Sequence, residues 1–147
     1  MSKKAARIEK EQDPFNVGQI RWVCVNVIVI EDSIDDVHNY CNNILKLGGT
    51  WKDGTNGGGK GSVWLESKNK FIAPQPYASW SLNNSTDIWE APITKPANPT
   101  FSHTEGEEVD TYLMTWNETD QRWEGLNREN NNNYYWNPTD SSWNLIT

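Results

Sequence analysis

The chain has 147 residues, enough for one domain or for one domain with a small appendage. Apolar residues make up only 35% of it, but nine Trp and five Tyr can each bury a large area, so we expect a thin, aromatic core built mainly from β-strands. The net charge of −7 argues against a nucleic-acid partner, which needs clustered Lys and Arg, and the longest apolar run, residues 23–30, is too short to span a membrane.

Residues 1–18 show no sustained periodicity, and their basic and acidic side chains are mixed. We expect a flexible, solvated arm that ends in Asp13-Pro14 and Gly18. The polar start, with no apolar segment after it, predicts no secretory signal peptide and folding in a cytoplasm.

Residues 21–30 (RWVCVNVIVI) give the strongest strand signal, because they are rich in β-branched side chains and apolar at alternate positions on both faces. We expect a central strand whose two faces are formed by Val23, Val25, Val27 and Val29 and by Trp22, Cys24, Ile28 and Ile30. Cys24 and Cys41 are not in a CxxC spacing, and we expect both to be reduced and buried.

One amphipathic helix is expected at about residues 34–47, capped by Ser33 and ended by Gly48-Gly49. Its apolar positions fall on one stripe, which would pack on the sheet; they are Ile34, Val37, Cys41, Ile44 and Leu45.

The glycine-rich segment at residues 51–61 (WKDGTNGGGKG) could be taken for a phosphate-binding loop. Such a loop opens a helix, whereas here Val63-Trp64-Leu65 follows and is typical of a strand. We therefore expect a flexible hairpin tip, followed by a second hairpin within residues 63–72.

Three segments place Trp on both sides of a polar turn sequence: Trp80–Trp89, Trp116–Trp123 and Trp136–Trp143. Cross-strand aromatic pairs stabilise hairpins, so we expect three β-hairpins closed by Trp pairs. The prediction is an α+β fold, mostly antiparallel β. Its expected parts are the arm (1–18), an α+β domain with the first Trp hairpin (19–92), a Pro-rich, acidic linker (93–110) and a unit of two Trp hairpins (111–147).

The stretch Phe71–Pro92, FIAPQPYASWSLNNSTDIWEAP, resembles a segment of small structural proteins of marine tailed phages, particularly cyanophages. Their pattern is roughly FIPPxPYPSWxL[ND]xxTxxWEAP, followed by YxW[ND]xxTxxW. This chain departs from it at Ala73 and Ala78, where the family tends to have proline, and by an Asn-rich insertion near residue 130.

The resemblance implies a non-enzymatic virion component, such as a small tail or capsid accessory protein, that is present in many copies and contacts other virion proteins. We expect those contacts on the extended flanks of the stretch, since extended peptides add readily to neighbouring proteins. The expected contact residues are Pro74, Pro76, Tyr77, Glu90 and Pro92.

Two alternatives use the aromatic side chains directly. A carbohydrate-binding module for host surface glycans would need exposed rings, and its candidate platform residues are Trp80, Trp89, Trp116, Trp123, Tyr134, Trp136 and Trp143. The segment Tyr134-Tyr135-Trp136-Asn137, with Ser142-Trp143 after it, also resembles part of a WW domain. That likeness implies binding of proline-rich peptides through Trp143 and Tyr134 or Tyr135, although the family's closing proline is absent.

No residues indicate catalysis, a metal site or a cofactor. His38 and His103 are isolated and lack metal-ligand spacing, and no nucleophile motif is present. The acidic residues of the 105–110 segment lack the ligand pattern of a calcium loop, and we expect a solvated acidic turn.

Overall fold

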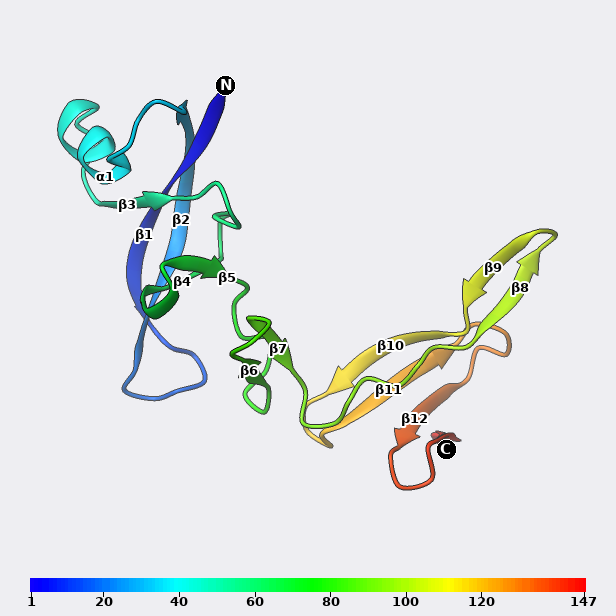
Figure 1. The fold of residues 1–147 in the computed structure, drawn as a ribbon. Helices are drawn as coiled ribbons and strands as arrows, with labels where there is room; N and C mark the ends of the chain where they lie inside the picture. Colours follow the sequence, from blue (N-terminus) through cyan, green and yellow to red (C-terminus); the bar gives the residue numbers. More distant parts are fainter. The chain divides into compact units, whose positions relative to one another are not determined.

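The computed structural model describes residues 1–147 and is mainly antiparallel β, with 47% of residues in strands and one short helical segment of 8 residues (Figure 1). The β-dominated fold and the single helix are confirmed, and the α+β label fits only roughly. Contacts divide the chain into two units. Unit 1 comprises Met1–Pro76 and Leu82–Trp89, and unit 2 comprises Tyr77–Ser81 and Glu90–Thr147.

Unit 1 contains a five-stranded sheet in the order β3-β1-β2-β4-β5. Its strands are β1 (Ser2–Gln12), β2 (Ile20–Glu31), β3 (Thr50–Asp53), β4 (Val63–Leu65) and β5 (Lys70–Ile72), with a 3-10 turn, η2 (Glu66–Lys68), between the last two. The strand predicted at residues 21–30 is β2, and it occupies the central position.

The prediction of a flexible arm is wrong, because these residues form β1, which pairs with β2 along its whole length. Ala5 and Ala6 are fully buried and belong to two separate core clusters, so the covering segments press on both faces of the strand. Small side chains permit that close approach. The pair Asp13-Pro14 begins the β1–β2 loop, where the Asp13 carboxylate accepts hydrogen bonds from the backbone N–H groups of Phe15 and Asn16 at 2.9 and 3.2 Å.

A β-bulge in β2 overturns the predicted alternation of its faces. Ile8 lies opposite Cys24 and Arg7 lies opposite Asn26, which leaves Val25 as an extra residue. One extra residue moves every later side chain of the strand to the opposite face of the sheet. Trp22, Cys24 and Val27 therefore pack in one cluster, and Ile28 and Ile30 pack in the other.

The helix is confirmed but is shorter than predicted, with α1 at Val37–Asn39 and a π-helical turn, η1, at Tyr40–Ile44. Asp36, and not Ser33, caps it, since its carboxylate accepts the Asn39 N–H at 2.9 Å. A π turn widens the helix by one residue per turn, which rotates the predicted stripe out of register. Val37 and Cys41 are buried, whereas Ile44 and Leu45 are exposed. Both cysteines are free and buried, as predicted.

The glycine-rich segment is not a hairpin tip, because β3 pairs with β1 whereas β4 pairs with β2. Residues 54–62 instead cross the sheet over Ala6. A Cβ on Gly54 would lie 3.0 Å from the Ala6 Cβ, and one on Gly58 would lie 2.4 Å from the Gly54 Cα. The crossing therefore requires glycine at these two positions. The predicted hairpin within residues 63–72 is present as β4–β5.

Unit 2 contains a four-stranded sheet in the order β10-β11-β12-β13 and a separate β8–β9 hairpin. The strands are β8 (Thr100–Thr104), β9 (Glu107–Asp110), β10 (Tyr112–Asn117), β11 (Arg122–Asn127), β12 (Asn133–Asn137) and β13 (Ser142–Leu145). Residues 93–110 are therefore not a linker. The Asn98 side chain bonds both the backbone N–H and the C=O of Tyr112, at 3.0 and 2.7 Å, in the manner of a strand partner.

The two C-terminal Trp hairpins are confirmed. Trp116 lies opposite Trp123 and Trp136 lies opposite Trp143, with ring centroids 5.3 and 5.6 Å apart.

The first hairpin is also present, as β6 (Ser81–Asn83) and β7 (Ile88–Glu90), but it is built differently from the prediction. In the other two hairpins the first Trp lies seven residues before the second. The residue seven before Trp89 is Leu82, and not Trp80. Trp80 precedes β6 and belongs to unit 2.

Candidate interaction site

All four Trp of the C-terminal hairpins lie on one face of the unit 2 sheet. Glu124 pairs with Tyr135, so the adjacent Trp123 and Trp136 share a face across β11 and β12. Each of these is paired with the second Trp of its own hairpin. This aromatic face carries five of the seven side chains that the sequence marks as a possible ligand platform, namely these four Trp and Tyr134.

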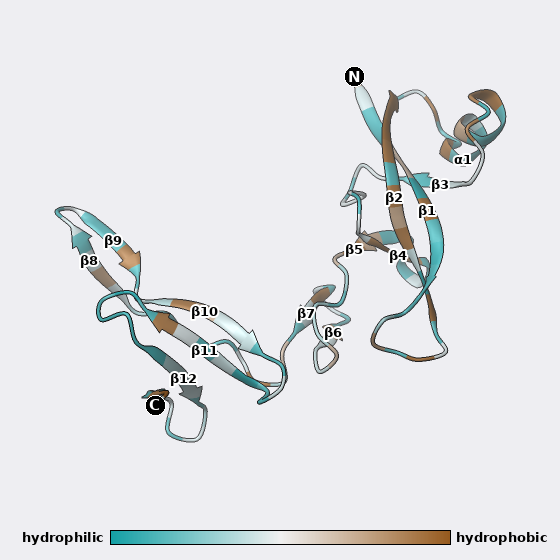
Figure 2. Cartoon of the chain, turned by 180° about the vertical axis from the view of Figure 1, so that it is seen from behind, coloured by the Kyte–Doolittle hydropathy of each residue, from teal (hydrophilic) through white to brown (hydrophobic).

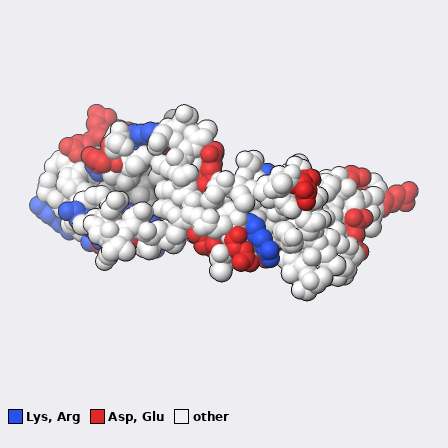
Figure 3. All heavy atoms as spheres, turned by 90° about the horizontal axis from the view of Figure 1, so that it is seen from below, with Lys and Arg blue, Asp and Glu red and all other residues white.

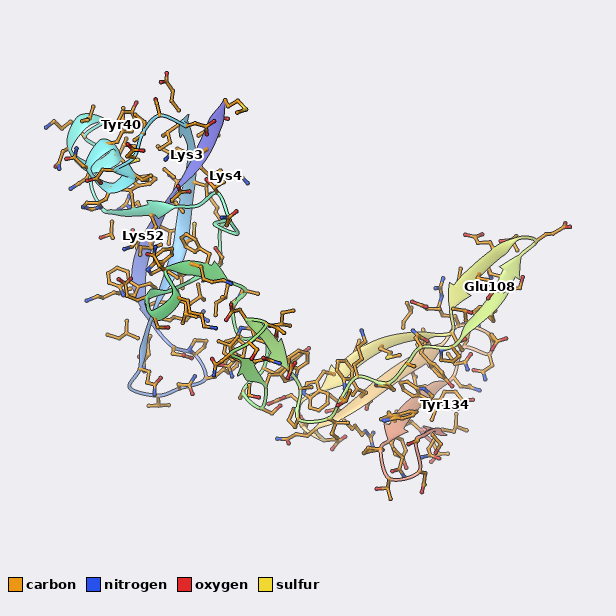
Figure 4. All side chains as sticks on the ribbon, in the orientation of Figure 1. Lys3, Lys4, Tyr40, Lys52, Glu108 and Tyr134 are labelled. Atoms are coloured by element: carbon orange, nitrogen blue, oxygen red, sulfur yellow. The ribbon has the colours of Figure 1, made fainter.

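Gly125 allows aromatic rings from non-neighbouring strands to meet on this face. Tyr112 of β10 stacks on Trp143 of β13, with centroids 4.2 Å apart and planes at 18°. Tyr134, labelled on β12 in Figure 4, packs edge-on against Tyr112 at 5.8 Å. A Cβ on Gly125 would lie 3.0 Å from the Tyr112 Cβ and 3.3 Å from the Trp143 ring. The face is thus an internally packed cluster.

The segment Tyr77–Ser81 packs on one end of the aromatic face. Trp80 meets Trp116 and Trp123 at centroid distances of 6.2 and 5.9 Å. The Glu118 carboxylate fixes the segment, because it accepts hydrogen bonds from Ser79 and from Trp116 Nε1–H at 2.7 Å. These hydrogen bonds lower the pKa of Glu118, and the bond from the Ser79 hydroxyl has the largest effect.

A second segment, residues 92–96, runs along the same face and forms a groove beside Trp136. Trp123 Nε1–H donates to the Ile93 carbonyl at 2.8 Å, and the Lys95 ammonium lies 5.5 Å from the centre of the Trp123 ring. The groove has a volume of about 410 Å³. It is lined by Pro92, Ile93, Thr94, Lys95, Pro96, Trp136, Pro138 and Ser141.

The structure separates the predicted platform residues. Trp116 and Trp123 are each only 6% exposed and belong to the core. Trp89 lies in unit 1, where its Nε1–H donates to the Ala73 carbonyl at 2.8 Å. Trp136 is half-buried and lines the groove, which makes it the platform residue best placed to meet a ligand.

The predicted contact residues are also separated. Pro74, Pro76, Glu90 and Pro92 are exposed, and Pro92 joins Trp136 in the groove. Tyr77 is half-buried, with its ring 5.5 Å from that of Trp80. Sequence reasoning missed the groove residues of the 93–96 segment because it assigned residues 93–110 to a linker, and it treated Pro138 and Ser141 only as part of the turn of the last hairpin.

In unit 1, Asp87 ties the β6–β7 turn to the sheet. Its carboxylate forms ion pairs with Lys68 and with Lys70, the latter at 2.6 Å. The hydrogen bond from Lys68 and then that from Lys70 lower the pKa of Asp87. Asp87 has a φ of 59°, and the corresponding residues Gln121 and Ser141 of the other hairpins are also left-handed. The three turns therefore share a left-handed residue at the same position, two residues before the second Trp.

The surface charge is mixed. On the face shown in Figure 3, Lys and Arg occur in small separate groups among Asp and Glu. The structure contains no group of three or more His, Cys, Asp or Glu side chains that could hold a metal ion. None of its helices has both the length and the apolar character needed to cross a membrane.

Comparison of the chain with family models, with curated proteins and with solved structures found no match.

Proposed function

We propose that this protein is a non-enzymatic structural component of a tailed-phage virion, a small tail or capsid accessory protein that binds neighbouring virion proteins. The resemblance of Phe71–Pro92 to phage structural proteins motivates the virion assignment. The observation that carries the binding role is the groove beside Trp136, which brings Pro92 and an aromatic side chain of the hairpin repeat to one surface.

The chemistry of the groove favours an extended peptide as its occupant. Three prolines and the Trp136 ring give flat apolar walls, which suit an extended chain with few internal hydrogen bonds. The Lys95 ammonium adds one positive charge at the rim. We therefore expect a partner segment that carries apolar residues and a carboxylate.

The first test is mass spectrometry of purified particles of the phage that encodes the chain. The proposal predicts that the chain is present in many copies per particle. Its consistent absence from pure particles would rule the virion assignment out.

The second test asks whether the groove makes the contact. Trp136→Ala is expected to reduce incorporation into particles, whereas Leu145→Ala, a truncation of an exposed residue of β13 outside the groove lining, is expected to leave it unchanged. Equal incorporation of both variants would show that the contact lies elsewhere, on Pro74, Pro76 or Glu90.

A second candidate function, binding of host surface glycans, is favoured by the combination of the Trp136 ring with the hydroxyl groups of Thr94 and Ser141 in one groove. A glycan array tests it. Retention of glycans that is abolished by Trp136→Ala, while the near-UV circular dichroism persists, would support this function over the structural one.

In the WW-like alternative, Trp143 would bind the proline-rich peptide, and in the structure its ring stacks on Tyr112. Titration of proline-rich peptides, followed by Trp fluorescence, tests that alternative.

A further inference from the structure

One edge of β2 is open over half of its length within unit 1. On one side β2 pairs with β1 throughout. On the other side β4 covers Trp22 and Val23, and Gly61 and Ser62 bond the backbone of Cys24 at 2.9 and 2.8 Å. Beyond that point the β1–β2 ribbon extends past β4 (Figure 1). Residues 26–31 of β2 therefore present a strand edge with no neighbouring strand of unit 1.

Two backbone groups at the ends of this edge are already bonded within the chain, because the Asn26 side chain accepts the Val27 N–H at 2.9 Å and the Glu31 carbonyl accepts the Ile34 N–H at 3.2 Å. Between these two points, around Val29, no side chain blocks the edge. Residues 25–30 (VNVIVI) contain no charge and no proline, and Figure 2 shows the end of β2 as hydrophobic. Val29 is 69% exposed. Folded proteins usually block such an edge with Lys, Pro or a covering element, because unpaired N–H and C=O groups pair with any available strand. The bulge at Val25 ends the open edge on one side.

From this we infer that β2 pairs antiparallel with β2 of a second copy of this chain, so that two five-stranded sheets become one continuous sheet. This inference does not depend on the proposed virion function.

The sequence of the edge selects a second copy as the occupant. A two-fold axis at Val29, the middle of the open edge, places this residue opposite its own copy, and residues on either side then meet in pairs. In an uncharged, β-branched segment this brings apolar side chains together and places no like charges opposite each other. A strand from a different protein would need distinctive side chains on this edge in order to bind it specifically, and the uniform VNVIVI segment offers few.

The pairing is tested with the full-length protein by sedimentation equilibrium over about a hundredfold range of concentration. The expected result is a rise from the 16.9 kDa of one chain to twice that mass. Val29→Lys is expected to remain monomeric at every concentration, because the pairing brings the two lysines together in the joined sheet. Its side chain is exposed, so the fold should be retained, which circular dichroism checks.

The matched control is Val17→Lys, which introduces the same charge at a residue that is 93% exposed in the β1–β2 loop. It is expected to dimerise like the parent. A parent that stays monomeric, or a Val29→Lys variant that dimerises normally, would overturn the inference. Loss of the dimer in both lysine variants would also overturn it, since it would indicate a general charge effect.

Hydrogen exchange gives a readout that does not depend on the variants. The amide groups of residues 28–31 that face away from β1 should exchange more slowly in concentrated than in dilute protein, while those of β10 and β11 should not change with concentration. Protection that is independent of concentration would contradict the pairing, whatever the particle experiments show.

Discussion

The Glu118 carboxylate accepts two hydrogen bonds from Ser79, one from the backbone N–H at 2.9 Å and one from the hydroxyl at 2.7 Å. Through Ser79 it fixes Trp80 against Trp116 and Trp123. A single ionised group therefore attaches a segment from the middle of the chain to the C-terminal sheet, and this attachment should depend on its charge.

The packing of Trp80 is expected to weaken in acid. Because the pKa of Glu118 is lowered in the folded protein, the unfolded state takes up the proton first as the pH falls. The stabilisation of the folded state by ionised Glu118 is complete above pH 4.5, the ordinary pKa of a Glu carboxyl group. It is lost as the pH falls through the lowered pKa of the folded protein. Near-UV circular dichroism of the Trp cluster should decrease in this range.

The variant Glu118→Gln should show the decrease already at neutral pH. Glu105→Gln, in the exposed β8–β9 turn, serves as the control and should titrate like the parent. A Glu118→Gln spectrum with the parent's pH dependence would contradict this assignment.

The second prediction concerns the close approach at Gly125. Gly125→Ala should reduce the free energy of unfolding by about 1–3 kcal/mol, because the added methyl group pushes Tyr112 away from Trp143. Urea unfolding followed by Trp fluorescence measures the change. Gly59→Ala, with nothing within 4 Å of its new Cβ, should stay within about 0.5 kcal/mol of the parent.

The third prediction uses the bulge. Deletion of Val25 restores an unbroken alternation and turns Ile28 and Ile30 away from their cluster, which costs about 1.5–3 kcal/mol for Ile30 alone. The deletion variant should be insoluble or unfold at much lower temperature. The matched substitution Val25→Ala changes an exposed side chain and should have little effect. A deletion variant with the parent's melting temperature would disprove the bulge.

The fourth prediction concerns thiol chemistry. Cys24 and Cys41 are 1% and 0% exposed, and burial raises the pKa of both thiols. Since the thiolate is the reactive form, neither should react with Ellman's reagent at pH 8 in the native protein, and both should react in guanidinium chloride. They lie in separate core clusters, so oxidation should not join them. Rapid native labelling of either thiol would contradict this burial.

Local patterns predicted β2 and the two C-terminal hairpins well. The repeated spacing from Trp116 to Trp123 and from Trp136 to Trp143 contains both the turn and the paired strands, so a short window of sequence suffices. The helix was recognised for the same reason, although its π turn was not, because no residue type signals an added residue per turn.

Features that depend on distant partners could not be predicted. β1 is rich in Ala, Lys and Glu, which disfavour strands, and it becomes one because β2 and the covering segments need small side chains at Ala5 and Ala6. Likewise, Trp80 packs against Trp116 and Trp123, which are far along the chain, and the groove depends on residues 92–96 packing beside Trp136. Such pairings leave no local periodicity.

The alternation of segments between the two units limits how the gene can be shortened. Tyr77–Ser81 belongs to unit 2, yet unit 1 supplies the residues on both sides of it. A fragment that starts at Glu90 therefore loses Trp80 and Ser79, and a fragment that stops at Pro76 loses Asp87, the partner of Lys68 and Lys70. An intact unit 1 needs the chain as far as Trp89, whereas an intact unit 2 needs the chain from Tyr77 onward. The two requirements overlap at residues 77–89, so no single cut in the gene separates two intact units.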